Sequence, residues 1–179
     1  MLDPAAGSLV VGSFALLFAS AALHKLRAPA RFTEVLRAYR IVPEGALGLS
    51  WLVAGAELAT AAGLLLAPVR PLATVAGAAL LALYAAAIAL NLARGRRELA
   101  CGCGGADEER PIAGWMVGRN LALALLLAAT LVPWGSRAML PTDAFTVAGG
   151  TAVAALLYMS VDRLLGRVLP RTAELRGPR

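Results

Sequence analysis

The sequence predicts an all-α protein, a polytopic membrane bundle of about five transmembrane helices with one interfacial amphipathic helix. Of its 179 residues, 59% are hydrophobic and 16% are charged, and the mean hydropathy is +0.72. Soluble domains are about half apolar and about a quarter charged. The charges here gather between apolar runs of roughly 20 residues, the length that spans a hydrocarbon core of about 30 Å.

The apolar runs also predict how the chain is divided. Four core spans are expected at 7–23, 46–67, 72–92 and 112–132, and a fifth span at 144–165. Because its charges follow it, the first run is expected to be a retained helix rather than a cleaved signal peptide. We expect a membrane domain over 1–133, an additional C-terminal span within 134–165, and a basic, disordered tail over 166–179.

Residues 29–43 follow a different pattern. Phe32, Val35, Leu36 and Tyr39 share one helical face, and the charged residues point elsewhere: Arg31, Glu34, Arg37 and Arg40. A proline stands at each end of the segment, where a helix can begin or stop. We expect an amphipathic helix on the membrane surface, held by its apolar face and by anionic lipid. The alternative is a connecting loop.

The basic residues predict the orientation in the cell membrane. With five spans, fifteen of the 17 Lys and Arg residues fall on one side, and only Arg70 and Arg137 fall on the other. Positive residues favour the cytoplasmic side. We therefore expect the N-terminus outside, the C-terminus inside and Cys101 and Cys103 at the cytoplasmic face. The net charge of +6 marks that face and does not indicate binding to nucleic acid.

The motif Cys101-Gly102-Cys103 carries both cysteines of the chain. Neighbouring arginines and the start of the fourth span favour the thiolate, the reactive form of a thiol. The glycines allow the tight backbone that a disulfide between these two residues needs. We favour a redox-active dithiol. Copper(I) binding and a flexible loop without chemistry are the alternatives, and two ligands are too few for a closed zinc site.

Polar residues within and beside the spans are further candidates. Glu57 is the single ionisable residue of the second span, and Tyr84 is expected at a similar depth, within hydrogen-bonding reach. Such a carboxyl group suggests a proton or quinone site, or alternatively a protonated acid that joins two helices. Further polar residues are expected at the end of the bundle that carries the cysteines: His24, Lys25, Asn91, Arg119 and Asn120. Of these, we expect His24 and Arg119 to lie near the thiols, as proton donor and thiolate stabiliser.

Several of these segments together resemble the MauE family (methylamine utilisation protein E), which is grouped with DoxX-like membrane proteins. The resemblance covers about residues 8–133 and rests on four stretches: Phe14…His24-Lys25-Leu26-Arg27-x-Pro29-x-x-Phe32, the span with Glu57, Asn91-x-x-Arg94-Gly95 with Cys101-Gly102-Cys103, and Arg119-Asn120. It implies a membrane protein that supports maturation of the disulfide-rich small subunit of methylamine dehydrogenase in the periplasm. It also implies a thioredoxin-like partner.

The function expected from residues and resemblance is therefore thiol–disulfide exchange through Cys101 and Cys103, which would make the protein a thiol–disulfide oxidoreductase. A quinone is the cofactor that this chemistry leaves open, and no metal is required. The alternative is a non-enzymatic carrier, a copper-binding assembly factor or a subunit of a larger membrane complex.

Overall fold

A computed structural model describes residues 1–40, 48–102 and 111–174, with side chains as far as Leu165. The chain folds into helices throughout these residues, joined by turns and two isolated bridges. The prediction for Cys103 lies outside the described residues. The prediction of a helix over 29–43 is covered only to Arg40.

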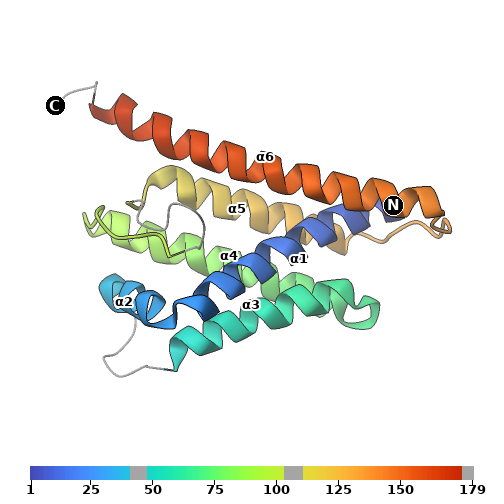
Figure 1. Cartoon of the computed structure of the whole chain (residues 1–179), viewed down its shortest axis with the longest axis horizontal. Coiled ribbons are helices and arrows are strands. Elements are labelled where there is room, and N and C mark those ends of the chain that lie inside the picture. The colour runs from blue at the N-terminus through green and yellow to red at the C-terminus, as the bar shows by residue number, and fades with distance from the viewer. Residues whose placement is uncertain (41–47, 103–110, 175–179) are drawn as a thin grey trace.

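Five apolar helices form the body of the molecule (Figure 1). They are α1 (Pro4–Arg27), α3 (Leu49–Leu65), α4 (Arg70–Ala93), α5 (Gly114–Ala128) and α6 (Pro141–Glu174). The short helix α2 (Pro29–Tyr39) follows α1, and the 3-10 turns η1 (Ala67–Val69) and η2 (Ala129–Leu131) cap the α3–α4 and α5–α6 connections. This confirms the predicted all-α membrane fold.

Four of these helical segments are long and apolar enough to cross a membrane: Pro4–Arg27, Ala67–Ala93, Gly114–Leu131 and Pro141–Leu165. Helix α3 is apolar but shorter, with 17 residues. At 1.5 Å per residue it is about 25 Å long, near the lower limit for a span. The five apolar runs of the sequence thus correspond to five helices, one of them short.

The core forms where four helices pack around aromatic and aliphatic side chains. Helix α1 packs against α3, and α4 packs against both α3 and α5. Phe18, Leu64 and Leu127 are almost completely buried there. Gly77 of α4 lets the helices approach closely, because a Cβ at this position would lie 2.8 Å from Leu127 and 3.0 Å from Phe18.

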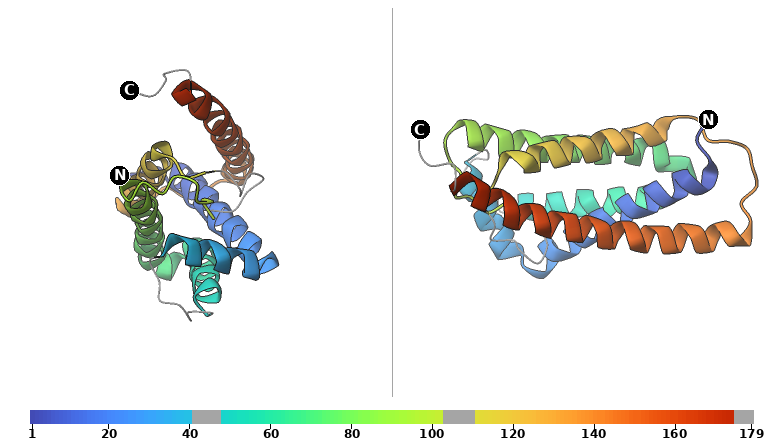
Figure 2. Two further views of the ribbon diagram at one scale, coloured as in Figure 1. Left: turned by 90° about the vertical axis from the view of Figure 1, so that its left-hand side faces the viewer. Right: turned by 90° about the horizontal axis from the view of Figure 1, so that it is seen from above.

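Helix α6 lies on the outside of this four-helix core (Figure 2) and packs along α1. None of its spanning residues is buried, and large apolar side chains such as Phe145 remain exposed. The contact with α1 is close at Gly150, where a Cβ would lie 2.4 Å from the Leu9 side chain. The helix extends beyond Leu165 to Glu174, into the segment for which a disordered tail was predicted.

Helix α2 lies across one end of the bundle (Figure 2). Its predicted apolar face exists, but it packs against protein rather than lipid: Phe32 and Tyr39 are 9% and 7% exposed. Val35 and Cys101 also pack on this side, against a buried cluster that contains Tyr39. The expectation that lipid holds the apolar face is therefore wrong, because the end of the bundle and the cysteine loop occupy that face.

Candidate functional site

An ion pair joins α1 and α3 inside the bundle. Nζ of Lys25, in the last turn of α1, donates a hydrogen bond of 2.8 Å to Oε1 of Glu57, at the middle of α3. The two side chains are 3% and 1% exposed. Lys25 was predicted at the end of a span, with the loop cations. Its Nζ instead turns inward and pairs with Glu57, a contact that the sequence did not predict.

Tyr84 of α4 completes this buried cluster. Its hydroxyl donates a hydrogen bond of 2.7 Å to the same Oε1 of Glu57, which confirms the predicted contact between these residues. The ammonium of Lys25 also lies over two aromatic rings, 5.0 Å from the Phe32 centroid and 5.7 Å from the Tyr84 centroid. Cation–π contacts of this kind stabilise a desolvated ammonium. Four helices thus contribute to one polar cluster, which we call the Lys25 cluster: Lys25, Phe32, Glu57 and Tyr84.

The first part of the cysteine motif is held against α2. Gly102 has a φ of +67°, and a Cβ there would lie 2.7 Å from Cγ1 of Val35. A glycine fits this position for both reasons, because other residues disfavour positive φ and have a Cβ. Before the motif, an isolated bridge between Ala100 and Pro111 brings the two ends of the connection together.

Hydrogen bonds from Tyr39 and Arg96 fix this end of the bundle around Cys101. The Tyr39 hydroxyl donates to the Cys101 carbonyl oxygen at 3.3 Å. Arg96 donates to Oδ1 of Asn91 at 3.1 Å and to the carbonyl oxygen of Ala38 at 2.6 Å. Asn91, which is completely buried, thereby anchors the guanidinium that ties the loop after α4 to α2. Cys101 itself is half-buried in this region.

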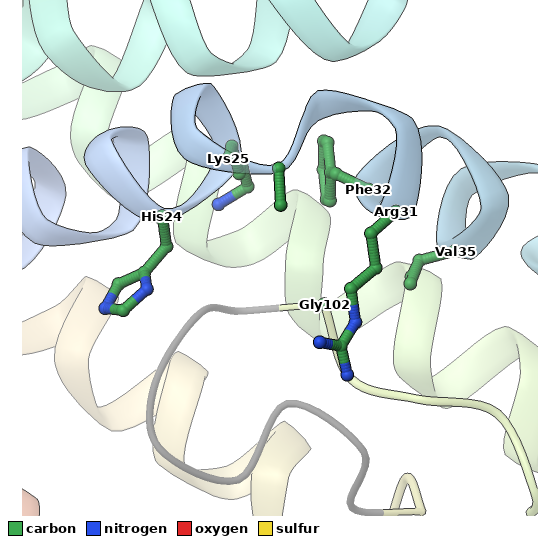
Figure 3. Close-up of a pocket in the computed structure, with 7 residues that line it drawn as sticks. His24, Lys25, Arg31, Phe32, Val35 and Gly102 are labelled. Carbon is green, nitrogen blue, oxygen red and sulfur yellow. The ribbon is translucent and has the colours of Figure 1, made fainter.

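A hollow separates the Lys25 cluster from the cysteine motif (Figure 3). His24, Lys25, Arg31 and Gly102 line it together with Ala28, Phe32 and Val35. Its volume is about 20 Å³, which is room for about one water. His24 and Lys25 thus lie with Gly102 of the motif around one hollow. That His24 and Arg119 lie near the two thiols stays a prediction.

The two candidates on α5 have different surroundings. Arg119 forms an ion pair with Asp162 of α6, and its guanidinium lies 5.3 Å from the centroid of the Trp115 ring. Asn120 is 3% exposed, and its Nδ2 finds no hydrogen-bond acceptor among the described residues. The contacts of Arg119 therefore tie α5 to α6, whereas Asn120 points into the bundle.

Several residues of this region were not singled out from the sequence as site residues. Arg96 was one of three arginines before the motif, and no pattern distinguished it from Arg94 and Arg97. Asp162 offered a signal, because it is an acidic residue near the end of an apolar run. Such a residue needs a partner in a membrane, and Arg119 supplies it.

Comparison with known proteins identifies the family. The sequence model of the family "Methylamine utilisation protein MauE" matches residues 4–135. The chain belongs to the MauE family. Relatives named "Methylamine utilization protein MauE" are 42% identical in Paracoccus denitrificans (89% of this chain, 87% of the relative), and 36% identical in Methylorubrum extorquens (90% and 86%). A third, from Methylophilus methylotrophus, is 33% identical (92% and 88%).

No solved structure matches the chain. The MauE family match ends before α6, whereas the alignments with these three relatives cover about nine-tenths of the chain. Most of the candidate site residues lie within the residues matched by the family model; Asp162, on α6, does not.

Proposed function

We propose that this protein is a multi-pass membrane protein of methylamine utilisation that exchanges thiols and disulfides with a partner protein through Cys101 and Cys103. The family match and the names of the relatives support the process. One structural observation carries the chemistry. Gly102, between the two cysteines, is held against α2 and forms a wall of a hollow that is lined by the cationic side chains Lys25 and Arg31.

The proposed exchange follows ordinary thiol chemistry. A thiolate of the motif attacks one sulfur of a partner disulfide, a mixed disulfide forms, and the released partner sulfur takes up a proton. The second cysteine of the motif, as thiolate, then attacks the mixed disulfide. The motif is thereby oxidised to a disulfide, and the partner is reduced to a dithiol. Two electrons pass between the proteins, and the reverse sequence oxidises the partner.

The surroundings of the motif support this role over that of an inert loop. Nearby cations lower the free energy of a thiolate relative to the thiol. Tyr39 of α2 donates a hydrogen bond to the Cys101 carbonyl oxygen, and Arg96, before the motif, donates one to the Ala38 carbonyl oxygen of α2. Cys101 is thereby held against α2, in a fixed position from which it can meet a partner. We propose a thioredoxin-like protein as the partner and the small subunit of methylamine dehydrogenase as the final client.

Single substitutions Cys101→Ser and Cys103→Ser test this function. In a host that grows on methylamine, each should abolish growth on methylamine and change the number of free thiols in the small subunit of methylamine dehydrogenase, as counted by mass spectrometry after alkylation; more free thiols would mean that the motif oxidises its partner, and fewer that it reduces it. Membrane insertion, measured by immunoblot of the membrane fraction, should be unchanged. Ser136→Ala, at the other end of the bundle, is the control. Full activity of both serine variants would exclude thiol exchange, and stoichiometric copper in the purified protein would favour a copper-binding assembly factor.

A further inference from the structure

The described residues next to Cys101 carry an exposed basic surface. Arg37 and Arg40 stand at the C-terminal end of α2, and Arg94 and Arg97 stand in the segment that follows α4. All four residues are exposed. We call this set the arginine surface: Arg37, Arg40, Arg94 and Arg97.

Packing brings the two halves of the arginine surface together. The guanidinium of Arg96 donates to the carbonyl oxygen of Ala38, in the last turn of α2, at 2.6 Å. Leu99 packs against the buried cluster that contains Tyr39 of α2. The hydroxyl of Tyr39 in turn donates to the carbonyl oxygen of Cys101. The arginine surface therefore lies beside Cys101, where α2 meets the segment after α4.

The charge of this region exceeds what its own acidic residues balance. Residues 34–40 and 94–98 contain five arginines and two glutamates, which gives a net charge of +3. In the part of the chain that the structure describes, no ion pair links the arginine surface to an acidic residue. The C-termini of α2 and α4 contribute only about −0.5 of an elementary charge each. The potential beside Cys101 is therefore positive and attracts anionic groups.

The backbone of Arg40 supports a function for these side chains. Arg40 ends α2 in the left-handed conformation, with a φ of +49° and a ψ of +39°. Glycine usually takes this position, because it has no Cβ and is not strained there. Among the described residues, every other positive φ belongs to a glycine. An arginine at this position lowers the stability of the fold, and what it adds is an exposed cation next to the motif.

The arginine surface faces away from the spanning part of the bundle. Looking onto this end of the molecule (Figure 2, left), α2 and the segment after α4 lie across the ends of the long helices. The inner face of α2 is covered, since Phe32 and Tyr39 are buried. Its charged face therefore points along the bundle axis into water rather than into the headgroups around the bundle. This position favours a protein over a lipid as the ligand.

We propose that the arginine surface docks an acidic face of the partner protein and thereby brings the partner's reactive sulfur to Cys101. This inference rests on the proposed thiol exchange, and it states the chemistry of the partner: a protein with clustered Asp and Glu side chains around its reactive cysteines. Opposite charges raise the rate of encounter and orient the two proteins. Pairs between guanidinium and carboxylate groups then hold the complex in one register.

Two synthetic peptides test the docking surface without the natural partner. Each carries one cysteine as a mixed disulfide with 2-thiopyridine, flanked by glutamates in one peptide and by glutamines in the other. In the full-length Cys103→Ser protein in phosphatidylcholine nanodiscs, the Cys101 thiolate attacks the peptide sulfur, a protein–peptide disulfide forms, and pyridine-2-thione leaves and is measured by its absorbance. The ratio of the two rates cancels any effect of the arginines on the thiol pKa, which acts on both reactions alike. At low salt the acidic peptide should react about tenfold faster, and at about 1 M salt the two rates should be equal.

Substitutions in the same Cys103→Ser protein assign the preference to the arginine surface. Arg40→Gln/Arg97→Gln should lower the rate ratio about threefold. Arg27→Gln/Arg163→Gln is the matched control, because it removes the same charge from exposed residues of α1 and α6 at the same end of the bundle, and it should keep the ratio. This control separates docking from the general role of basic residues in topology. Arg40→Gly should lower the ratio about twofold and raise the Tm, because glycine relieves the left-handed strain, whereas a purely structural role would lower the Tm.

Equal rates of the two peptides at low salt would overturn the docking surface, and so would equal ratios in Arg40→Gln/Arg97→Gln and its control. Nanodiscs that contain phosphatidylglycerol decide the alternative ligand. If the difference between the protein with all its arginines and Arg40→Gln/Arg97→Gln disappears there, the surface binds lipid headgroups and the proposal is wrong. These reactions use only Cys101 and no natural partner. Their failure is therefore distinct from failure of the proposed function, which the serine variants in cells decide.

Discussion

The ion pair between Lys25 and Glu57 makes each residue dependent on the other. Breaking a buried pair by removing one partner typically destabilises a protein by about 3–5 kcal/mol, because an uncompensated charge is left behind. Removing both charges together is often neutral. Lys25 and Glu57 are both buried, so these values apply to them directly.

We therefore predict that Lys25→Met and Glu57→Gln each lower the free energy of unfolding by about 3 kcal/mol, and that the double variant recovers most of this loss. Chemical unfolding in detergent micelles, followed by circular dichroism, measures the three values. Additive losses in the double variant would contradict a direct pair. Thr74→Val, a buried polar residue outside the Lys25 cluster, serves as the control.

Gly102 allows a second prediction at this scale. Gly102→Ala should displace the motif from α2, because the new Cβ would lie 2.7 Å from Val35 and the backbone has a positive φ. Gly95→Ala is a matched control, with a φ of +75° and no atom within 4 Å of the new Cβ. Both should lose about 1 kcal/mol from backbone strain. Only Gly102→Ala should change the alkylation rate of the cysteines, and equal rates in the two variants would contradict close packing on α2.

The sequence predicted part of this site for a clear reason. The depth of a residue in a span follows from its distance to the span ends, so Glu57 and Tyr84 were expected side by side, and they are. Lys25 stands at the end of a span, where a long side chain can reach either the interface or the interior. Only the packing of α1 against α3 and α2 decides between these directions, and this packing is not visible in the sequence.

Helix α2 also shows that a sequence pattern does not reveal packing partners. An amphipathic pattern indicates which face of a helix is apolar, but it does not tell what that face meets. Phe32 and Tyr39 meet the bundle and the cysteine loop rather than lipid. Helix α2 and the cysteine motif that it covers are distant in the sequence, because Tyr39 and Cys101 are 62 residues apart. No local sequence pattern therefore links them.

The contact between α1 and α6 depends on Gly150. We predict that Gly150→Val weakens it by about 1–3 kcal/mol, since a Cβ there would lie 2.4 Å from the Leu9 side chain. Gly149→Val is the control, because no atom lies within 4 Å of its Cβ position. The distance between spin labels placed on α1 and α6 should increase in the first variant only. An unchanged distance in both would contradict close packing at Gly150.

At the opposite end from α2, Arg137 connects the starts of α1 and α6. Its guanidinium donates to the carboxylates of Asp3, at 3.1 Å, and Asp143, at 2.7 Å. The hydrogen bond from Arg137, together with the Ala5 backbone N–H, lowers the pKa of Asp3 below its usual value of 3.8. A lowered pKa in the folded state means that Asp3 stabilises the fold above that value, and that this contribution disappears as the pH falls through the lowered pKa.

Arg137→Gln should therefore lower the Tm slightly at about pH 7, and the difference from the wild type should vanish at an acid pH below the lowered pKa of Asp3. Thermal unfolding at both pH values measures the change, which is small because these side chains are largely exposed. Arg70→Gln is the control cation at this end of the bundle. A difference between the wild type and Arg137→Gln that persists in acid would exclude the carboxylates as the cause.

For the whole molecule, the five helices of the bundle place the start of α1 and the end of α6 at opposite ends (Figure 1). Helix α2 lies at the same end as the end of α6, and Cys101 lies there too, because its carbonyl oxygen accepts a hydrogen bond from Tyr39 of α2. This arrangement agrees with the five helices expected from hydropathy. Periodicity and hydropathy predicted the helices well, because an apolar helix in lipid satisfies its own backbone. Periodicity and hydropathy could not predict which helices pack together, because this packing depends on close approach at glycines such as Gly77.

The positive-inside count predicts which end faces the cytoplasm. Tags fused to the two termini should report opposite sides, with protease from outside removing only the N-terminal tag from intact cells. A membrane-impermeant maleimide should leave Cys101 and Cys103 unlabelled until the cells are opened. Labelling from outside would reverse the orientation and would place the motif on the same side as a periplasmic client.

The buried ion pair also fixes an order of events during synthesis. Lys25 enters the bilayer 32 residues ahead of Glu57. At the end of α1, the lysine can keep its ammonium in the headgroup region until α3 arrives. Glu57, at the middle of α3, has no comparable route to water. Helix α1 can therefore insert first without burying an unpaired charge, whereas α3 cannot. We expect α3 to insert against an α1 that is already in place.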